Sequence, residues 1–260
     1  MLKLEFKINK HYLVARLLKH YSLCNEWNDL KNKLWKKFPE GFYLLSSYPE
    51  LLFVDDNILQ LNKGFVQAKQ LFEFVLKSKG FNKIYKETEN YLLWLKNQWE
   101  KNENRVIKEL ENITKLTLPD KQIKVCVVHP KMHNGLSVPE RNIIFWGHLE
   151  KWKNYSVIYI CHEIMHVLTY KKYQNDKIIH ALIELAVDNE LKYRLNKKDK
   201  HSKSMEEKSF LDIPEGLKRE IAEMKKIKER ILPFWKKYLK GHYSKNILDL
   251  EKKIAENLKI

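Results

Sequence analysis

The stretch His162-Glu163-Ile164-Met165-His166 lies within an apolar run that extends from Tyr155 to Tyr170. On an α-helix, residues four apart lie one above the other on the same face, so His162 and His166 project their imidazole rings in one direction. Two such rings can bind one zinc ion at roughly 2.0–2.1 Å. Glu163 lies one step round the helix, where its carboxylate can accept a proton from a metal-bound water. The spacing therefore predicts a zinc-binding helix over residues 155–171.

The residues around this motif leave the predicted helix almost no polar face. Apolar side chains fill most of the run: Val157, Ile158, Tyr159, Ile160, Ile164, Val167 and Leu168. A helix that is apolar all round is buried. Burying two histidines and a glutamate without partners costs free energy, and a bound metal with supporting contacts removes that cost. We therefore prefer a zinc site to the alternative, a hydrogen-bonded cluster in the core.

A second apolar stretch predicts another long buried helix, over residues 177–195. His180, Glu184 and Asp188 follow at intervals of four and form one polar stripe on it. Two buried helices that each carry a polar stripe are expected to turn those stripes together. A catalytic zinc site needs a third protein ligand and an open position for water.

Among these three residues, Glu184 is the best placed third ligand. Asp188, one turn further on, can accept the spare ring N–H of a ligand histidine and so fix its tautomer. His180 has three open roles: it competes with Glu184 as third ligand, contacts substrate, or supports the ligands.

The combined pattern, His162-Glu163-x-x-His166 followed by Glu184-x-x-x-Asp188, resembles the gluzincins, the thermolysin-like clan of zinc metallopeptidases. The resemblance covers about residues 121–195. It implies that the two histidines and Glu184 bind Zn²⁺, that Glu163 is the general base, and that Asp188 supports the ligands. It also implies a zincin-like catalytic core, in which a small β-sheet packs on the zinc-binding helix.

The chain departs from two related patterns. A metzincin has glycine three residues, and histidine six residues, after the second motif histidine, and here Thr169 and Lys172 hold those positions. Thermolysin often has asparagine before its third-ligand glutamate, and here Ile183 precedes Glu184. The sequence therefore indicates the clan but no family within it.

The composition argues against several other classes of function. The chain has 260 residues, of which 44% are hydrophobic, enough for one large domain or two small ones. Its net charge of +16 comes almost entirely from lysines spread along the chain, without a compact arginine-rich or aromatic-interleaved motif. We therefore do not expect nucleic-acid binding. No run approaches the ~20 apolar residues of a membrane span.

The three cysteines, Cys24, Cys126 and Cys161, are odd in number and far apart. Each lies in an apolar pattern, which favours buried thiols in a reducing compartment. Cys161 adjoins His162 but faces another side of the helix, so we do not count it as a ligand. The first residues lack the apolar core of a signal peptide. These features predict a soluble, cytoplasmic protein.

The chain is expected to form a mostly α-helical α+β protein in two regions. The apolar pattern of residues 1–118 predicts helices. Three roles stay open for this N-terminal region: it shapes the active-site cleft, recognises substrate or covers the zinc site. Residues 119–260 form the zincin-like catalytic region, with strands over 122–128 and 142–147, a loop over 131–141 between them, and C-terminal helices after an exposed loop at 196–208. By the resemblance, residues 143–146 form the edge strand along the cleft, to which extended substrate adds; an ordinary buried strand is the alternative.

The predicted function is zinc-dependent hydrolysis of peptide bonds in a peptide or protein substrate. A second donor for the developing oxyanion is needed, and His242, Tyr243 and His201 are candidates, although no spacing distinguishes them from ordinary surface residues. Two alternatives stay open: a zinc-containing regulatory or binding protein without turnover, and a hydrolase of a non-peptide amide. Structural zinc sites tend to be rich in cysteine and have no need of Glu163, which favours the enzyme.

Overall fold

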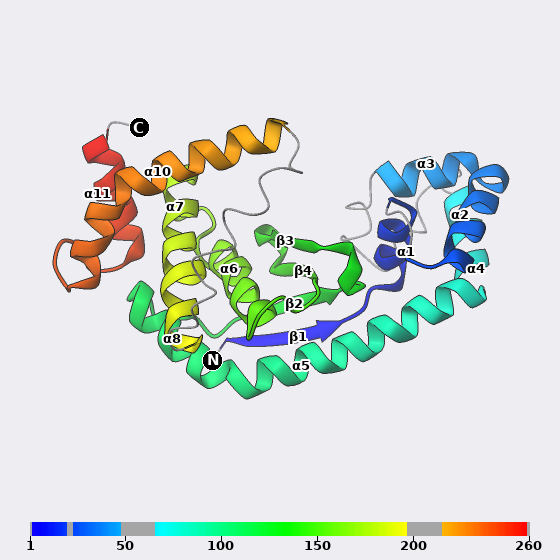
Figure 1. Ribbon diagram of the computed structural model, residues 1–260, viewed down its shortest axis with the longest axis horizontal. Coiled ribbons are helices and arrows are strands. Elements are labelled where there is room, and N and C mark those ends of the chain that lie inside the picture. The colour runs from blue at the N-terminus through cyan, green and yellow to red at the C-terminus, as the bar shows by residue number, and fades with distance from the viewer. Residues whose placement is uncertain (1, 20–22, 48–65, 197–214, 259–260) are drawn as a thin grey trace.

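The computed structural model describes residues 2–19, 23–47, 66–196 and 215–258. Four strands form one mixed sheet in the order β1-β2-β4-β3 (Figure 1). Their bounds are β1 Lys3–Lys7, β2 Gln122–Val127, β3 Asn134–Val138 and β4 Ile143–Gly147. β1 and β4 run parallel to β2, whereas β3 runs antiparallel to β4. The prediction of a mostly helical α+β protein with a small sheet is confirmed.

The two central strands were predicted, and the two edge strands were not. The expectation of helix was wrong at β1, and the expectation of a loop was wrong at β3. An edge strand pairs on one side only, and its solvent-exposed positions carry polar residues. Its sequence therefore lacks the apolar run that indicates β2 and β4. The edge-strand interpretation of residues 143–146 was also wrong, because β4 pairs with β2 on one side and with β3 on the other.

Successive strand residues point to opposite faces, and the sheet therefore joins two hydrophobic cores. Val125 and Ile144 face the core that contains the predicted zinc helix, whereas Cys126 and Phe145 face the N-terminal helices. Those helices are α1 (Lys10–Lys19), α2 (Asn25–Lys37), α3 (Pro39–Ser47) and α4 (Val66–Leu76). Helix α3 begins at Pro39, and proline is well suited to the first position of a helix.

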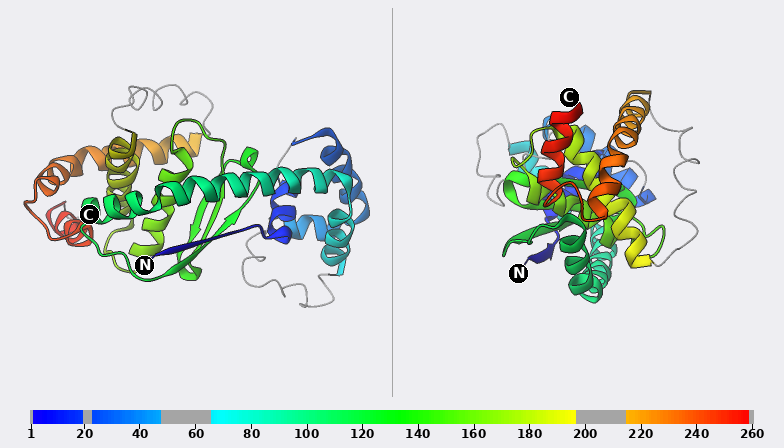
Figure 2. Two further views of the ribbon diagram at one scale, coloured as in Figure 1. Left: turned by 90° about the horizontal axis from the view of Figure 1, so that it is seen from below. Right: turned by 90° about the vertical axis from the view of Figure 1, so that its left-hand side faces the viewer.

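The longest helix, α5 (Lys79–Thr114), has 36 residues and connects the two cores. Its first turns pack among the N-terminal helices through Phe81 and Ile84, and its later turns pack in the other core through Trp99 and Leu110. Figure 2 shows that it runs along most of the length of the molecule. The N-terminal helices therefore lie at one end of α5, and the predicted zinc helix lies towards the other.

The two helices that carry the predicted ligands form as expected. They are α6 (Tyr155–Thr169), and a continuous helical run made of α7 (Asp176–Ile183), the π-helical stretch η6 (Glu184–Leu191) and α8 (Lys192–Asn196). Helices α10 (Glu215–Leu239) and α11 (Ile247–Leu258) pack against α7. Pro233 lies inside α10, which continues beyond it. Within the described ranges, no helix is both long and apolar enough to cross a membrane.

Candidate metal centre

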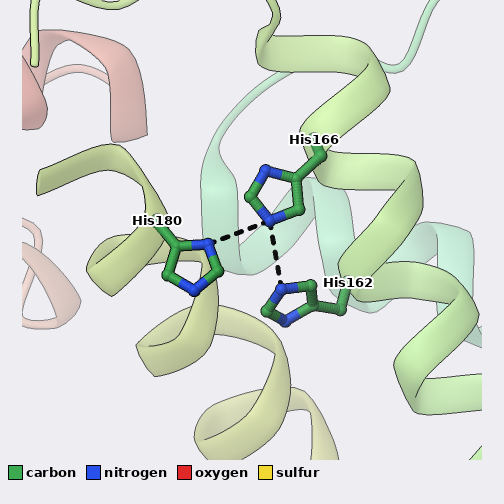
Figure 3. A group of neighbouring side chains, drawn as sticks. All are labelled: His162, His166 and His180. Carbon is green, nitrogen blue, oxygen red and sulfur yellow. Dashed lines mark hydrogen bonds between the residues drawn. The ribbon is translucent and has the colours of Figure 1, made fainter. Parts of the chain in front are cut away.

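Three histidines from two helices converge at one point. Helix α6 presents His162 and His166, and helix α7 presents His180, so that the rings face one another (Figure 3). The Nε2 atom of His166 lies 3.1 Å from His162 Nε2 and 3.1 Å from His180 Nδ1. The metal-binding nitrogens of all three rings lie within 4.8 Å of one another. The predicted pairing of two polar stripes is therefore present in the fold.

The chemistry of this donor set fits a single metal ion. A ring nitrogen of neutral imidazole offers either one N–H or one lone pair, so His166 Nε2 cannot satisfy both neighbours well by hydrogen bonding. Burial, and then the charges of His162 and His180, lowers the pKa of His166 to about 3, so this ring is neutral at physiological pH. Tetrahedral ligands at 2.0–2.1 Å from zinc lie about 3.3–3.4 Å apart. The observed 3.1 Å separations are close to that spacing.

The outer nitrogens of two of these rings face carboxylates. His162 Nδ1 lies 3.1 Å from Asp188 Oδ1. Burial alone would lower the pKa of His162, but contact with Asp188 outweighs it and raises that pKa. His180 Nε2 lies 3.6 Å from Glu184 Oε1, which is an electrostatic contact longer than a hydrogen bond. A carboxylate behind the outer ring nitrogen is the usual support for a metal-binding histidine, since it fixes the tautomer and orients the ring.

Glu184, the preferred third ligand in the sequence analysis, lies beside the three nitrogens and not among them. Its second carboxylate oxygen, Oε2, forms an ion pair with Lys228 Nζ of α10 at 2.9 Å. Burial would raise the pKa of Glu184, but contacts with His180 and Lys228 outweigh it and lower that pKa to about 2. The carboxylate is therefore ionised. It stands at the start of η6, and π-helical stretches occur frequently at functional sites.

The general-base candidate Glu163 borders strand β3. Ser137 of this strand lies beside Glu163, and burial raises the pKa of the carboxyl against the opposing effects of His162 and Ser137. A Cβ atom at Gly135 would lie 3.1 Å from Trp146 Cζ3 and 3.8 Å from Glu163 Oε1. The small residue lets the strand pass close to the site. The Asn134-Gly135 pair is typical of a turn, and for that reason the sequence predicted a loop where β3 forms.

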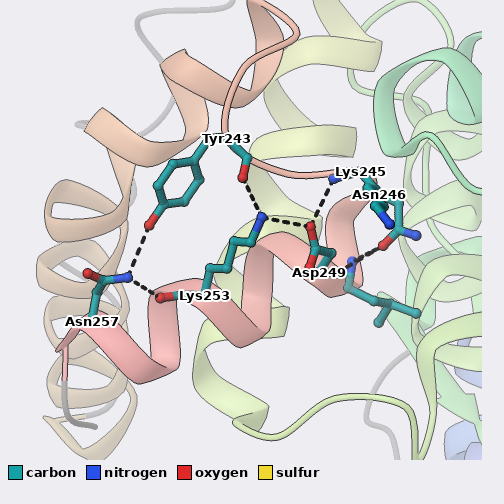
Figure 4. A network of polar contacts seen from close by, with 7 residues as sticks. Tyr243, Lys245, Asn246, Asp249, Lys253 and Asn257 are labelled. Carbon is teal, nitrogen blue, oxygen red and sulfur yellow. Dashed lines mark hydrogen bonds and ion pairs between the residues drawn. The ribbon is translucent and has the colours of Figure 1, made fainter.

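Two of the three candidates for the oxyanion donor, His242 and Tyr243, lie away from the histidines. Tyr243 lies in the turn between α10 and α11 (Figure 4), where its hydroxyl accepts a hydrogen bond from Asn257 Nδ2 at 3.1 Å. Its carbonyl oxygen accepts from Lys253 Nζ at 2.6 Å. His242 is exposed in the same turn, and no contact described for either residue reaches the three histidines. His201 lies outside the described residues.

Comparison with known proteins adds no assignment to this geometry. The chain matches no protein-family model. It also has no significant match among curated proteins or among solved structures. The function must therefore be argued from the side chains of the candidate metal centre and from the strand beside it.

Proposed function

We propose that the protein is a zinc-dependent peptidase, in which His162, His166 and His180 hold the metal and Glu163 is the general base. The observation that carries this proposal is the convergence of three ring nitrogens next to Glu163. This glutamate is half-buried and lies on the same helix as two of the three histidines. The carboxylates of Asp188 and Glu184 behind two rings add support, because a carboxylate at the outer ring nitrogen usually supports a metal-binding histidine.

The chain's own residues provide the proton transfers of such a reaction. Zinc, when bound, lowers the pKa of water towards neutrality and polarises a carbonyl group. Glu163 accepts the proton of the attacking water and delivers it to the leaving amine. Burial brings the pKa of Glu163 upward, towards the range in which a general base operates near neutral pH.

Strand β3 supports a peptide substrate over a non-peptide amide. Among the described residues β3 pairs only with β4, so its outer edge presents backbone N–H and C=O groups that no strand satisfies. An extended peptide can add to such an edge by main-chain hydrogen bonds. Gly135 and Ser137 bring this strand next to Glu163, so a peptide bound there would run past the general base.

The test compares wild type with Glu163→Gln in zinc content and in hydrolysis of a fluorogenic peptide library. We expect both proteins to contain zinc. The variant should hydrolyse the peptides about 10²–10⁴-fold more slowly, as is typical for the loss of a general base. Glu140→Gln, which changes an exposed glutamate in the turn after β3, is the matched control and should leave the rate unchanged. Equal rates in wild type and Glu163→Gln would contradict the proposal. Turnover of non-peptide amides alone would change the substrate class.

A further inference from the structure

The ion pair behind the metal centre has a role that the donor set alone does not reveal. We propose that Lys228 is a positioning residue that holds Glu184 away from the metal, so that His180 is the third ligand. This inference rests on the proposed zinc site and concerns which side chains complete it. The residue that decides the ligand set therefore comes from α10, a helix outside both predicted ligand helices.

The geometry engages both oxygens of the Glu184 carboxylate. Oε2 contacts Lys228 Nζ at 2.9 Å, and Oε1 faces His180 Nε2 at 3.6 Å. The other ring nitrogen of His180, Nδ1, is the one that points to His166. Glu184 therefore acts on the centre through the back of the His180 ring, in the same way that Asp188 acts through the back of His162.

Lys228 and zinc compete for one carboxylate. The side chains of Lys228 and Glu184 are only 26% and 21% exposed, so the pair is largely removed from water. Taking away the ammonium group would leave a partly buried anion without its counter-ion, which is costly. A dication held by the three nitrogens would then be the available partner. The ion pair thus sets the barrier that keeps Glu184 from becoming a ligand.

The ligand set changes the charge at the reacting centre. Three neutral imidazoles leave the full positive charge of the ion to act on water and on a carbonyl, whereas a carboxylate ligand would neutralise part of it. By holding Glu184 outside the ligands, Lys228 favours the more strongly polarising centre. The gluzincin resemblance implies the opposite choice, with Glu184 bound to zinc.

A double-mutant cycle on the full-length chain tests this inference without reference to activity. The zinc dissociation constant is measured by competition with a chromophoric chelator for wild type, Lys228→Met, Glu184→Gln and the double variant. In the wild-type background, Glu184→Gln should weaken binding by about 10–100-fold, as expected for a group behind a ligand. Lys228→Met should tighten binding, and Glu184→Gln should then have a clearly larger effect, because the two positions are coupled.

Two controls separate positioning from simple charge repulsion and from misfolding. Lys225→Met removes the same charge from an exposed position of α10, and Lys228→Arg keeps the ion pair; both should bind zinc as wild type does. The visible absorption of the Co²⁺-substituted protein should change in Lys228→Met but not in the double variant, because only the former allows a carboxylate to join the metal. Circular dichroism of the metal-free variants checks that each is folded.

The outcomes that overturn the inference are distinct from failure of the proposed function. Loss of zinc binding in Glu184→Gln alone would show that Glu184 is already a ligand. Undiminished binding in His180→Ala would show that His180 is not one. If Lys228→Met increased zinc affinity equally in the presence and absence of the Glu184 carboxylate, Lys228 would act only by repelling the metal ion and not by positioning Glu184. A wild-type protein that binds no zinc would overturn the zinc site itself, and this inference with it.

Discussion

Glu251 of α11 is almost completely buried, at 1% exposure, and it fixes the start of the helix that carries His180. Its carboxylate accepts hydrogen bonds from two backbone N–H groups just before α7. Asn175 N lies 2.7 Å from Oε1, and Gln174 N lies 3.2 Å from each oxygen. We predict that Glu251→Gln destabilises the protein and loosens the metal centre, although the residue lies outside it.

The size of the effect follows from these contacts. A hydrogen bond to a charged group contributes about 1.5–3 kcal/mol, and a buried donor left without a partner costs about 1–3 kcal/mol. Glutamine keeps one acceptor oxygen but loses the charge, and it turns an NH₂ group towards the peptide N–H groups. We therefore expect a loss of about 2–3 kcal/mol. For a chain of this size, about 1 kcal/mol corresponds to about 2–4 °C in Tm, so Tm should fall by about 4–12 °C.

The assay is thermal unfolding of the metal-free protein, followed by circular dichroism and calorimetry. Glu256→Gln, on an exposed position of the same helix, is the control and should leave Tm unchanged. Zinc affinity should also fall in Glu251→Gln, because α7 begins at Asp176, directly after the clamped backbone. An unchanged Tm in Glu251→Gln would refute the reasoning, since it would mean that the buried carboxylate does not hold this turn.

Three further predictions concern the site and the sheet. Asp188→Asn should weaken zinc binding by about 10–100-fold in a chelator titration, because His162 loses its charged partner. Gly147→Ala should cost about 1–3 kcal/mol or more in urea unfolding, because its Cβ would lie 2.8 Å from the Val128 carbonyl oxygen. Burial, and to a smaller extent the charges of His133 and Lys151, lowers the pKa of His148 from 6.5 to about 4 in the folded protein. As the pH falls, the unfolded chain therefore binds this proton before the folded chain does. The free energy of unfolding should therefore fall as pH drops from 6.5 towards 4, and His148→Gln should make urea unfolding at pH 5 less sensitive to pH.

The ligand helices could be predicted because their signal is local. Apolar residues at most positions of 155–170 and 178–195 require burial, and histidines four apart must share a face whatever the rest of the chain does. The same reasoning located β2 and β4: β4 is buried along its whole length, and β2 is buried from Val125 to Val127. Strands β1 and β3 could not be predicted in this way, because an edge strand forms by pairing with a neighbouring strand and has no continuous apolar run of its own.

The third ligand could not be predicted by the same means. His180 and Glu184 lie on one stripe, and each has a side chain able to bind zinc, so spacing along the helix cannot choose between them. In our proposal the choice depends on Lys228, which is 44 positions further along the chain and reaches Glu184 only because α10 packs on α7. The position of β3 beside Glu163 likewise depends on the pairing of β3 with β4.

The sequence by itself determined that His162, Glu163 and His166 stand on one buried helix, and that a second buried helix carries a polar stripe. These features follow from helical periodicity and from the cost of burying polar groups, which act over a few residues. Only the tertiary structure decided that His180 faces the pair, that Lys228 forms an ion pair with Glu184, and that the edge strand β3 lies next to Glu163. Contacts between distant segments depend on how the helices and strands pack, and local sequence patterns do not predict that packing.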